Sequence, residues 1–405
     1  MYSHIELSRL QDISIYIHVP FCRSKCAYCS FYSSQPKNEK EVSHYFFCIQ
    51  NEIEAFFEKS SIPVRTVYIG GGSPDIYGLE NLAQFCNTIL NILPNTPIEW
   101  TVECNPEGIT TQGIHALQSS PVTRLSIGIQ SFNSSLLSLL ERKAGIETIE
   151  KANAIIKKYW DKELNIDLLY GIPRQTLDMV NYDLDMLNGI NPKHVSAYEL
   201  TPEKNTILMQ ALITGKLTLP DEETILQMYR TVKQSLKSLD IIQYEISNYA
   251  RPGKECLHNQ RYWKMRPYAG FGQAAVSTLP GENNSVLRIK GRQNYNNMGL
   301  NNGYVNDKAY STETVSGIDF LFEYCLMSLR TNEGINISQF HYHFGFNFEN
   351  TFYHLLNRWY KSELAEKNKN CISLTEKGLL IQNTLLTELL EEIETSNELI
   401  QINWP

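Results

Sequence analysis

The chain has 405 residues, of which 42% are hydrophobic, and its formal net charge is −8 at pH 7. This length and apolar content suffice for a barrel-sized domain with an accessory domain, and the acidic balance argues against general attraction to nucleic acid or anionic lipid. No stretch approaches the roughly 20 apolar residues that span a bilayer, and the first residues lack a secretory pattern, so we expect a cytoplasmic protein without an integral membrane segment.

Six short apolar runs alternate with amphipathic segments in the first half of the chain. The expected strands cover residues 13–19, 66–70, 98–104, 124–130, 164–171 and 194–200. Helical periodicity marks residues 38–59, 79–93, 134–141, 147–160 and 176–189. Alternating strands and helices predict an α/β fold with a parallel sheet, which can be a full or partial (β/α) barrel or an open doubly wound sheet. We assign residues 1–250 to a partial (β/α)6 barrel.

The second half of the chain has a different pattern. A long amphipathic helix is expected over residues 221–239, followed by a further strand at 244–250. Residues 251–315 are rich in Gly, Asn, Tyr and Arg, and we interpret them as an irregular connecting and closing segment. Residues 316–405 are expected to form a smaller, mainly helical, winged-helix-like domain. This domain lacks an Arg/Lys stripe, which argues against DNA binding.

Polar residues or glycines follow each of the six expected strands. Three cysteines follow the first strand, and GGGSP at 70–74 follows the second. The remaining four strands carry, in order, Glu103, Gln130, Asp167 and Glu199 at or near their carboxyl ends. Because parallel barrels build their active sites at this edge of the sheet, these residues predict a functional site there.

The three cysteines, Cys22, Cys26 and Cys29, are spaced C-x3-C-x2-C, whereas the other six of the nine are scattered singly. This distribution is not a disulfide framework, and structural zinc needs four ligands. A [4Fe–4S] cluster has four irons, so three thiolates leave one iron open. S-adenosylmethionine can chelate that iron through its amino and carboxylate groups, and cleavage of its sulfonium by one electron generates a radical.

This cysteine motif, with Tyr28 just before its last cysteine and GGGSP after the second strand, resembles the signature of the radical S-adenosylmethionine superfamily. Further stretches include YIHVPFC, ECNPE, RLSIGIQSFN, LLERK, NIDLLYGIP and HVSAYELT. They are similar to the branch that contains oxygen-independent coproporphyrinogen III oxidases and heme chaperones. The resemblance covers nearly the whole chain.

The resemblance implies that Cys22, Cys26 and Cys29 hold a [4Fe–4S] cluster. It also implies a set of S-adenosylmethionine contacts at Tyr16, Tyr28, Gly71, Gly72, Ser73, Glu103, Gln130, Arg142 and Asp167. Whether one or two such molecules bind stays open. Ser73 stands where the family usually has Thr, and Asp75 is a less usual neighbour without an interpretation. We expect His18 to be a hydrogen-bonding partner rather than a ligand.

Two features favour the chaperones over the oxidases. The oxidases carry a fourth cysteine where this chain has Phe31, and HNQRYW at 258–263 resembles a run that marks the chaperone branch. Heme is a flat apolar disc with two carboxylates and an iron that takes axial ligands. The candidate heme contacts are His258 on iron, Tyr262 and Trp263 stacked on the ring, and Arg261 or Arg266 at the propionates.

Other interpretations of this segment stay open. Cys256 or Met265 can replace His258 as the iron ligand. Alternatively, His258 and Asn259 cap a turn, and the aromatic side chains belong to the core.

We therefore hypothesise a heme chaperone that carries a [4Fe–4S] cluster with exchangeable S-adenosylmethionine and passes heme to an acceptor, such as a respiratory protein. This hypothesis includes an electron donor for the cluster and peripheral contact with a membrane. The alternative is an oxygen-independent coproporphyrinogen III oxidase, which removes carboxyl groups from propionate side chains. A radical enzyme acting on an unrelated substrate is the third hypothesis.

Overall fold

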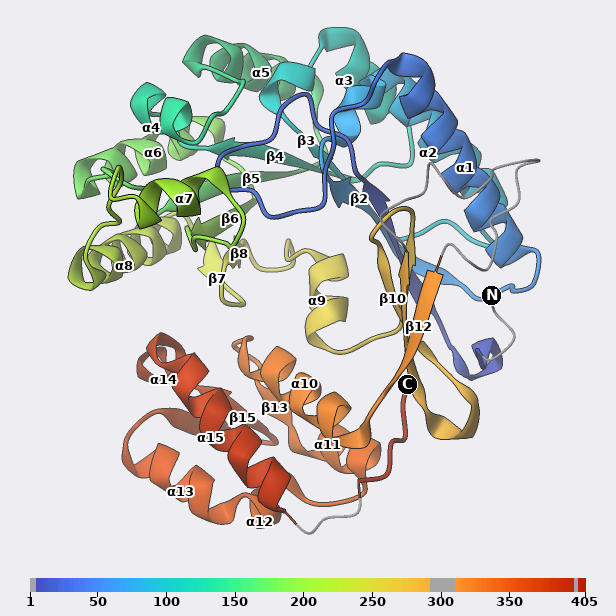
Figure 1. Cartoon of the computed structure of the whole chain (residues 1–405), viewed down its shortest axis with the longest axis vertical. Helices are drawn as coiled ribbons and strands as arrows, with labels where there is room; N and C mark the ends of the chain where they lie inside the picture. Colours follow the sequence, from blue (N-terminus) through green and yellow to red (C-terminus); the bar gives the residue numbers. More distant parts are fainter. Residues whose placement is uncertain (1–4, 292–309, 397–399) are drawn as a thin grey trace.

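The computed structural model describes residues 5–291, 310–396 and 400–405. A curved sheet with helices on its outer side forms the larger part of the molecule, and a mainly helical unit lies beside it (Figure 1). None of the described helices is both long enough and apolar enough to cross a membrane.

Six parallel strands form the centre of the sheet. They are β1 (Ile13–Val19), β2 (Val64–Gly71), β3 (Glu99–Cys104), β4 (Arg124–Gln130), β5 (Glu163–Tyr170) and β6 (His194–Glu199). Each pairs in parallel with the next in chain order. The apolar runs predicted these strands because both faces of such a sheet are covered, so that six of the seven residues of β1 are buried.

The helices between these strands cover one face. They are α1 (Glu39–Phe57), α2 (Leu79–Ile92), α3 (Thr111–Gln118), α4 (Ser134–Leu139), α5 (Ile146–Tyr159) and α6 (Leu177–Ile190). Two more helices, α7 (Ile207–Ile213) and α8 (Glu222–Ser238), follow β6. In Figure 1 the helices from α1 to α6 lie outside the arc of strands, which is the arrangement of a partial barrel and not of a doubly wound sheet. The sequence analysis did not predict α3 and α7.

The prediction of one continuous strand at 244–250 is wrong. Two short strands, β7 (Ile242–Gln243) and β8 (Asn248–Ala250), pair with each other across a turn, and β8 pairs antiparallel with β6.

The description of residues 251–315 as irregular is also wrong where the structure describes them. They form α9 (Leu257–Trp263), β9 (Tyr268–Phe271), β10 (Val276–Pro280), β11 (Val286–Gly291) and β12 (Tyr310–Val315). The sheet order is β12-β11-β10-β9-β1-β2-β3-β4-β5-β6-β8-β7, with β9 parallel to β1. Such short strands depend on their pairing partners and show little periodicity. Residues 292–309 of this segment lie outside the described residues.

The C-terminal unit has its own buried core. Its elements are α10 (Gly317–Leu329), β13 (Ile335–Asn336), α11 (Ile337–Phe344), α12 (Phe348–Thr351), α13 (Tyr353–Lys361), β14 (Ala365–Asn368), β15 (Cys371–Leu374), α14 (Glu376–Leu380) and α15 (Gln382–Thr395). The strands form a short antiparallel sheet in the order β13-β15-β14. Met265 and Val286 pack into this core from the preceding segment, and the division of the chain at residues 250 and 315 stays a prediction.

Candidate functional site

A cavity of about 420 Å³ opens at the carboxyl edge of the parallel strands. Its walls come from the loop after β1, the glycine segment after β2 and the ends of the strands from β3 to β6. Eleven of the twelve residues expected to hold the cluster and its cosubstrate line it, namely Cys22, Cys26, Tyr28, Cys29, Gly71, Gly72, Ser73, Glu103, Gln130, Arg142 and Asp167. We call this the strand-end cavity.

The glycine segment lies directly against the cysteine loop. The Gly72 amide donates to the Val19 carbonyl at 2.7 Å, and the Ser73 amide donates to the Phe21 carbonyl at 2.7 Å. A Cβ atom on Gly72 would lie only 2.5 Å from the Phe21 carbonyl oxygen, and Gly71 has a φ of +109°. Only glycine lets the two segments approach this closely, so GGGSP holds the cysteine loop in place as well as lining the cavity.

The three cysteines fit a cluster better than a single metal ion. Cys22, Cys26 and Cys29 are all partly exposed and form no disulfide. Among the described residues, no group of three or more His, Cys, Asp or Glu side chains forms a site that could hold one metal ion. Structural zinc takes four protein ligands, whereas a [4Fe–4S] cluster offers each of three thiolates a separate iron.

Arg142 ties the cysteine loop to the strand ends. Its guanidinium donates to the Cys26 Sγ at 3.5 Å, to the Asn105 Oδ1 at 2.8 Å and to the Gly128 carbonyl. The Asn105 side chain in turn donates to the Ser73 Oγ at 2.7 Å. Asn105 is therefore a site residue that the sequence analysis did not single out, although it belongs to the ECNPE motif.

Asp75 has a structural explanation that the sequence did not provide. Its carboxylate is 1% exposed and accepts from the Arg23 guanidinium at 2.6 Å and from the Asn105 amide at 3.1 Å. Arg23 belongs to the cysteine loop, so this ion pair fastens the loop to the start of the short helix at Pro74–Tyr77. A buried carboxylate that lost this partner would be strongly destabilising.

Glu103 lies at the floor of the strand-end cavity. It accepts from the Tyr68 hydroxyl at 2.6 Å and from the Gly71 amide at 3.1 Å. Burial raises the pKa of Glu103 to about 7, and the nearby Asp167 also raises it. A cationic group entering the cavity would lower this pKa again, because an ammonium favours the charged carboxylate.

Asp167 is the second acid at the strand ends of the cavity. It accepts from the Asn165 side chain at 2.7 Å and from the Ser126 hydroxyl at 3.4 Å. Burial raises the pKa of Asp167 to about 6, although these hydrogen bonds work in the opposite direction. Together with Glu103 it offers acceptors that suit an ammonium or the hydroxyls of a ribose.

Tyr16 is the one expected cosubstrate residue outside the cavity lining. Its hydroxyl lies 3.0 Å from the Nδ1 of His18, and the His18 Nε2 lies 3.2 Å from the Tyr32 carbonyl. His18 therefore supports the cysteine loop from below by hydrogen bonds, as expected. Gln130 lines the cavity with a φ of +73°, after an irregularity in the pairing of β4 with β5.

The HNQRYW run forms helix α9, and its histidine is enclosed. His258 is 0% exposed, with its Nδ1 2.8 Å from the Thr66 hydroxyl and its Nε2 2.9 Å from the Tyr262 hydroxyl. Burial lowers the pKa of His258 to about 3. Neither ring nitrogen is free to bind iron in this conformation, and Cys256 and Met265 are buried as well. Heme ligation by His258 stays a prediction that requires α9 to move.

Comparisons with known proteins agree with this arrangement. A profile for the Radical SAM superfamily matches residues 16–187, and a profile for the HemN C-terminal domain matches residues 315–381. A protein of Buchnera aphidicola subsp. Schizaphis graminum named heme chaperone HemW is 31% identical over 95% of this chain and 100% of its own length. A Bacillus subtilis protein of the same name is 28% identical over 94% of this chain and 100% of its own length.

A solved structure shows the same fold. The radical SAM coproporphyrinogen III oxidase from Escherichia coli superimposes with a TM-score of 0.79 over 96% of this chain and 92% of that one, at 20% sequence identity. The full-length sequence relatives, the matching profiles and the three cysteines at the strand edge lead to one conclusion. This chain belongs to the HemW family of the radical SAM superfamily.

Proposed function

We propose that this chain is a heme chaperone: it binds heme, carries a [4Fe–4S] cluster with an exchangeable S-adenosylmethionine, and passes the heme to an acceptor protein. The observation that carries the proposal is that three thiols and the polar strand ends line one cavity, in a chain whose relatives of similar length are named heme chaperones. The alternative, a coproporphyrinogen III oxidase, has support from the likeness of fold and from the match to the HemN C-terminal domain profile.

The chain's own residues have distinct roles in this proposal. Cys22, Cys26 and Cys29 would hold the cluster, and Arg142 beside Cys26 would stabilise the negative charge of the thiolates. When bound, the reduced cluster and its cosubstrate supply one-electron cleavage of a sulfonium. Glu103 and Asp167 would accept hydrogen bonds from the cosubstrate, because both are carboxylates that line the cavity.

The cysteine loop also distinguishes the two activities. Phe31 occupies the position where the family resemblance places a further cysteine in the oxidases, and its side chain is 66% exposed. An apolar side chain there binds no metal and donates no proton. This supports a chain that carries heme rather than one that decarboxylates a porphyrinogen.

An anaerobic experiment on reconstituted protein tests the proposal. Heme is titrated into the protein and followed by its absorption, while coproporphyrinogen III, S-adenosylmethionine and a reductant are supplied in parallel and the products are separated. We expect stoichiometric heme uptake and no decarboxylated product. Turnover of the porphyrinogen would favour the oxidase, and absence of heme uptake would remove the chaperone proposal.

The transfer step needs its own measurement. Heme-loaded protein is mixed with a heme-free respiratory cytochrome, and the spectrum of the cytochrome is followed with time. Transfer faster than from free heme with albumin as carrier is expected of a chaperone. A cytoplasmic location and a separate electron donor are part of the same proposal.

A further inference from the structure

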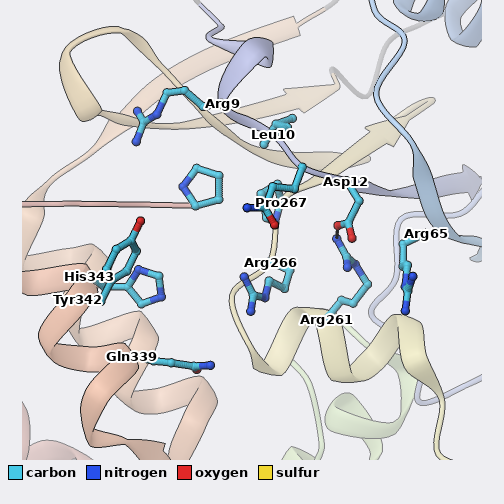
Figure 2. A pocket seen from close by; sticks show the side chains of 12 residues that line it. Arg9, Leu10, Asp12, Arg65, Arg261, Arg266, Pro267, Gln339, Tyr342 and His343 are labelled. Atoms are coloured by element: carbon cyan, nitrogen blue, oxygen red, sulfur yellow. Dashed lines mark hydrogen bonds and ion pairs between the residues drawn. The ribbon is translucent and has the colours of Figure 1, made fainter.

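A second cavity of about 530 Å³ lies at the opposite edge of the sheet, against the C-terminal unit (Figure 2). Arg65 is the second residue of β2, whose last residue, Gly71, lines the strand-end cavity. Helix α9 and β2 provide one wall, and helix α11 provides the facing wall. Its cationic and imidazole side chains define what we call the arginine pocket, namely Arg9, Arg65, Arg261, Arg266 and His343.

The pocket has more positive charge than its own carboxylates balance. Asp12 is the single acidic side chain among its described lining residues, and it pairs with Arg261 at 2.6 Å. Arg9 pairs with Glu6 at 3.4 Å, and the terminal carboxylate of Pro405 also lines the pocket. Within the described part of the chain, the side chains of Arg65 and Arg266 have no hydrogen-bond or ion-pair partner. Burial lowers the pKa of Arg261, and the nearby Arg266 and Arg65 lower it further. In a chain with a net charge of −8, such a cluster is suited to a ligand with anionic groups.

His343 gives the pocket a second chemical character. The side chain is 9% exposed, and its Nδ1 lies 2.8 Å from the Asn403 carbonyl. Because a carbonyl only accepts, Nδ1 carries the proton and Nε2 keeps its lone pair in the neutral ring. Nε2 has no partner among the described residues. A histidine held by a backbone carbonyl through Nδ1, with Nε2 free, is the usual arrangement of a metal ligand.

The remaining walls offer apolar contact. Leu10 and Pro267 line the pocket near β1 and β9, and Tyr342 lies next to His343 with 59% of its side chain exposed. A ligand that uses all these features has carboxylates at one edge, a flat apolar body and an iron that takes a nitrogen ligand. A phosphate or nucleotide would use the arginines but would leave His343 without a role.

We propose that the arginine pocket binds heme, with its propionates at Arg65 and Arg266 and its iron on the Nε2 of His343. This inference rests on the proposed function and gives the heme a site at the edge of the sheet away from the cysteines. Helix α9 contributes through Arg261 and the adjoining Arg266, while His258 stays enclosed with Thr66 and Tyr262.

The test compares side-chain variants of the cluster-loaded protein in anaerobic heme titrations. His343→Asn keeps a donor for the Asn403 carbonyl but removes the iron ligand, so the Soret and visible bands are expected to change even where heme still binds. His341→Ala, on the exposed side of the same helix, is the matched control and should leave the spectrum unchanged. Adding imidazole to His343→Ala should restore the wild-type spectrum, which a merely structural role would not allow.

The roles of Arg65 and Arg266 are tested by changing the arginines in one set of titrations and the carboxylates of heme in another. Arg65→Gln and Arg266→Gln are each expected to weaken heme binding roughly tenfold, because each removes a charge-assisted hydrogen bond. Both side chains are exposed, so the fold should be kept. Arg358→Gln, on the distant helix α13, is the control. The dimethyl ester of heme should bind wild type and the two arginine variants equally, since the ester cannot pair with a guanidinium.

The outcomes separate this inference from the proposed function. If wild type takes up no heme, both are wrong. If wild type takes up heme and His343→Asn, Arg65→Gln and Arg266→Gln match it in spectrum and affinity, the arginine pocket is not the site, while the chaperone proposal stands. A spectral change confined to His258→Ala would likewise contradict the pocket and restore the ligand expected from the sequence.

Discussion

The two cavities lie at opposite edges of one sheet and are built in opposite ways. The strand-end cavity takes its residues from short continuous motifs, such as the cysteine loop, GGGSP and ECNPE, each at the carboxyl end of a strand. The arginine pocket takes its five defining side chains from four separate segments of the chain, and Arg261 alone among them belongs to a motif, HNQRYW. Motifs thus mark the first site, whereas only tertiary packing assembles the second.

The two cavities also differ in how their polar groups are satisfied. In the strand-end cavity, Arg142, Asn105 and Ser73 bond to one another, and Glu103 has two donors. In the arginine pocket, Arg65 and Arg266 have no such partner within the described residues. Side chains that hydrogen-bond to one another keep their conformation before a ligand binds, whereas unpaired like charges repel one another until an anion binds. Removing an arginine should therefore cost stability where the guanidinium is paired and cost little where it is unpaired.

The largest expected effect is on the cluster. Replacing Cys22, Cys26 or Cys29 by Ala removes one of three thiolates, and we expect each variant to lose nearly all iron and sulfide after anaerobic reconstitution. Iron and sulfide analysis with EPR of the reduced protein measures this. Cys371→Ala, a partly exposed cysteine of the C-terminal unit, is the control and should keep the full cluster. A variant of the loop that retained the cluster would show that the cavity is not its site.

An intermediate effect is expected from the pH dependence of Glu103. Its pKa is raised from 4.5 to about 7 by burial, so its protonated form is favoured in the folded state. The stabilisation is present below about pH 4.5 and is lost as the pH rises through about 7, which amounts to about 3 kcal/mol. Asp167, with a pKa raised to about 6, adds to the same decline.

Glu103→Gln should remove most of this decline, so the variant gains stability relative to wild type between pH 5 and pH 8. Urea unfolding at both pH values, without added S-adenosylmethionine, measures the difference. Glu150→Gln, an exposed residue of α5, is the control and should follow wild type. A Glu103 variant with the same pH profile as wild type would mean that this carboxyl is not buried and uncharged in the empty cavity.

The smallest effect, on the free energy of unfolding, is expected in the arginine pocket. Arg65→Gln and Arg266→Gln should change the free energy of unfolding by no more than about 0.5 kcal/mol, or raise it slightly, because they remove repulsion and no ion pair. Arg124 is the comparison: it is 4% exposed and pairs with Glu99 at 3.3 Å. Arg124→Gln should cost about 3 kcal/mol. Equal losses at all three positions would contradict the contrast between unpaired and paired arginines.

Much of the barrel followed from the sequence alone. Expected and observed bounds agree for β1 and β4 and differ by at most two residues for the other central strands. A strand that is buried on both faces needs a continuous apolar run, and that is a local property of the sequence. The order of polar residues at the strand ends predicted the strand-end cavity for a related reason, since parallel strands finish at one edge.

Other features could not be predicted in this way. Strands β9 to β12 have four to six residues each, and β9 pairs with β1, whose residues lie some 250 positions earlier in the chain. His258 looks like an available ligand in the sequence, yet Thr66 and Tyr262 occupy both of its ring nitrogens. Burial and hydrogen bonding of this kind depend on partners far away in the chain.

Short stretches of sequence are enough to specify the parallel strands, the cysteine motif and the edge of the sheet where the site residues lie, because apolar runs and strand-end residues act over a few neighbouring positions. Tertiary structure alone decided that β9 to β12 extend the sheet, that His258 is enclosed, and that α11 of the C-terminal unit faces α9 across the arginine pocket. Those outcomes depend on contacts between distant segments, and no short stretch of sequence specifies which segments will meet.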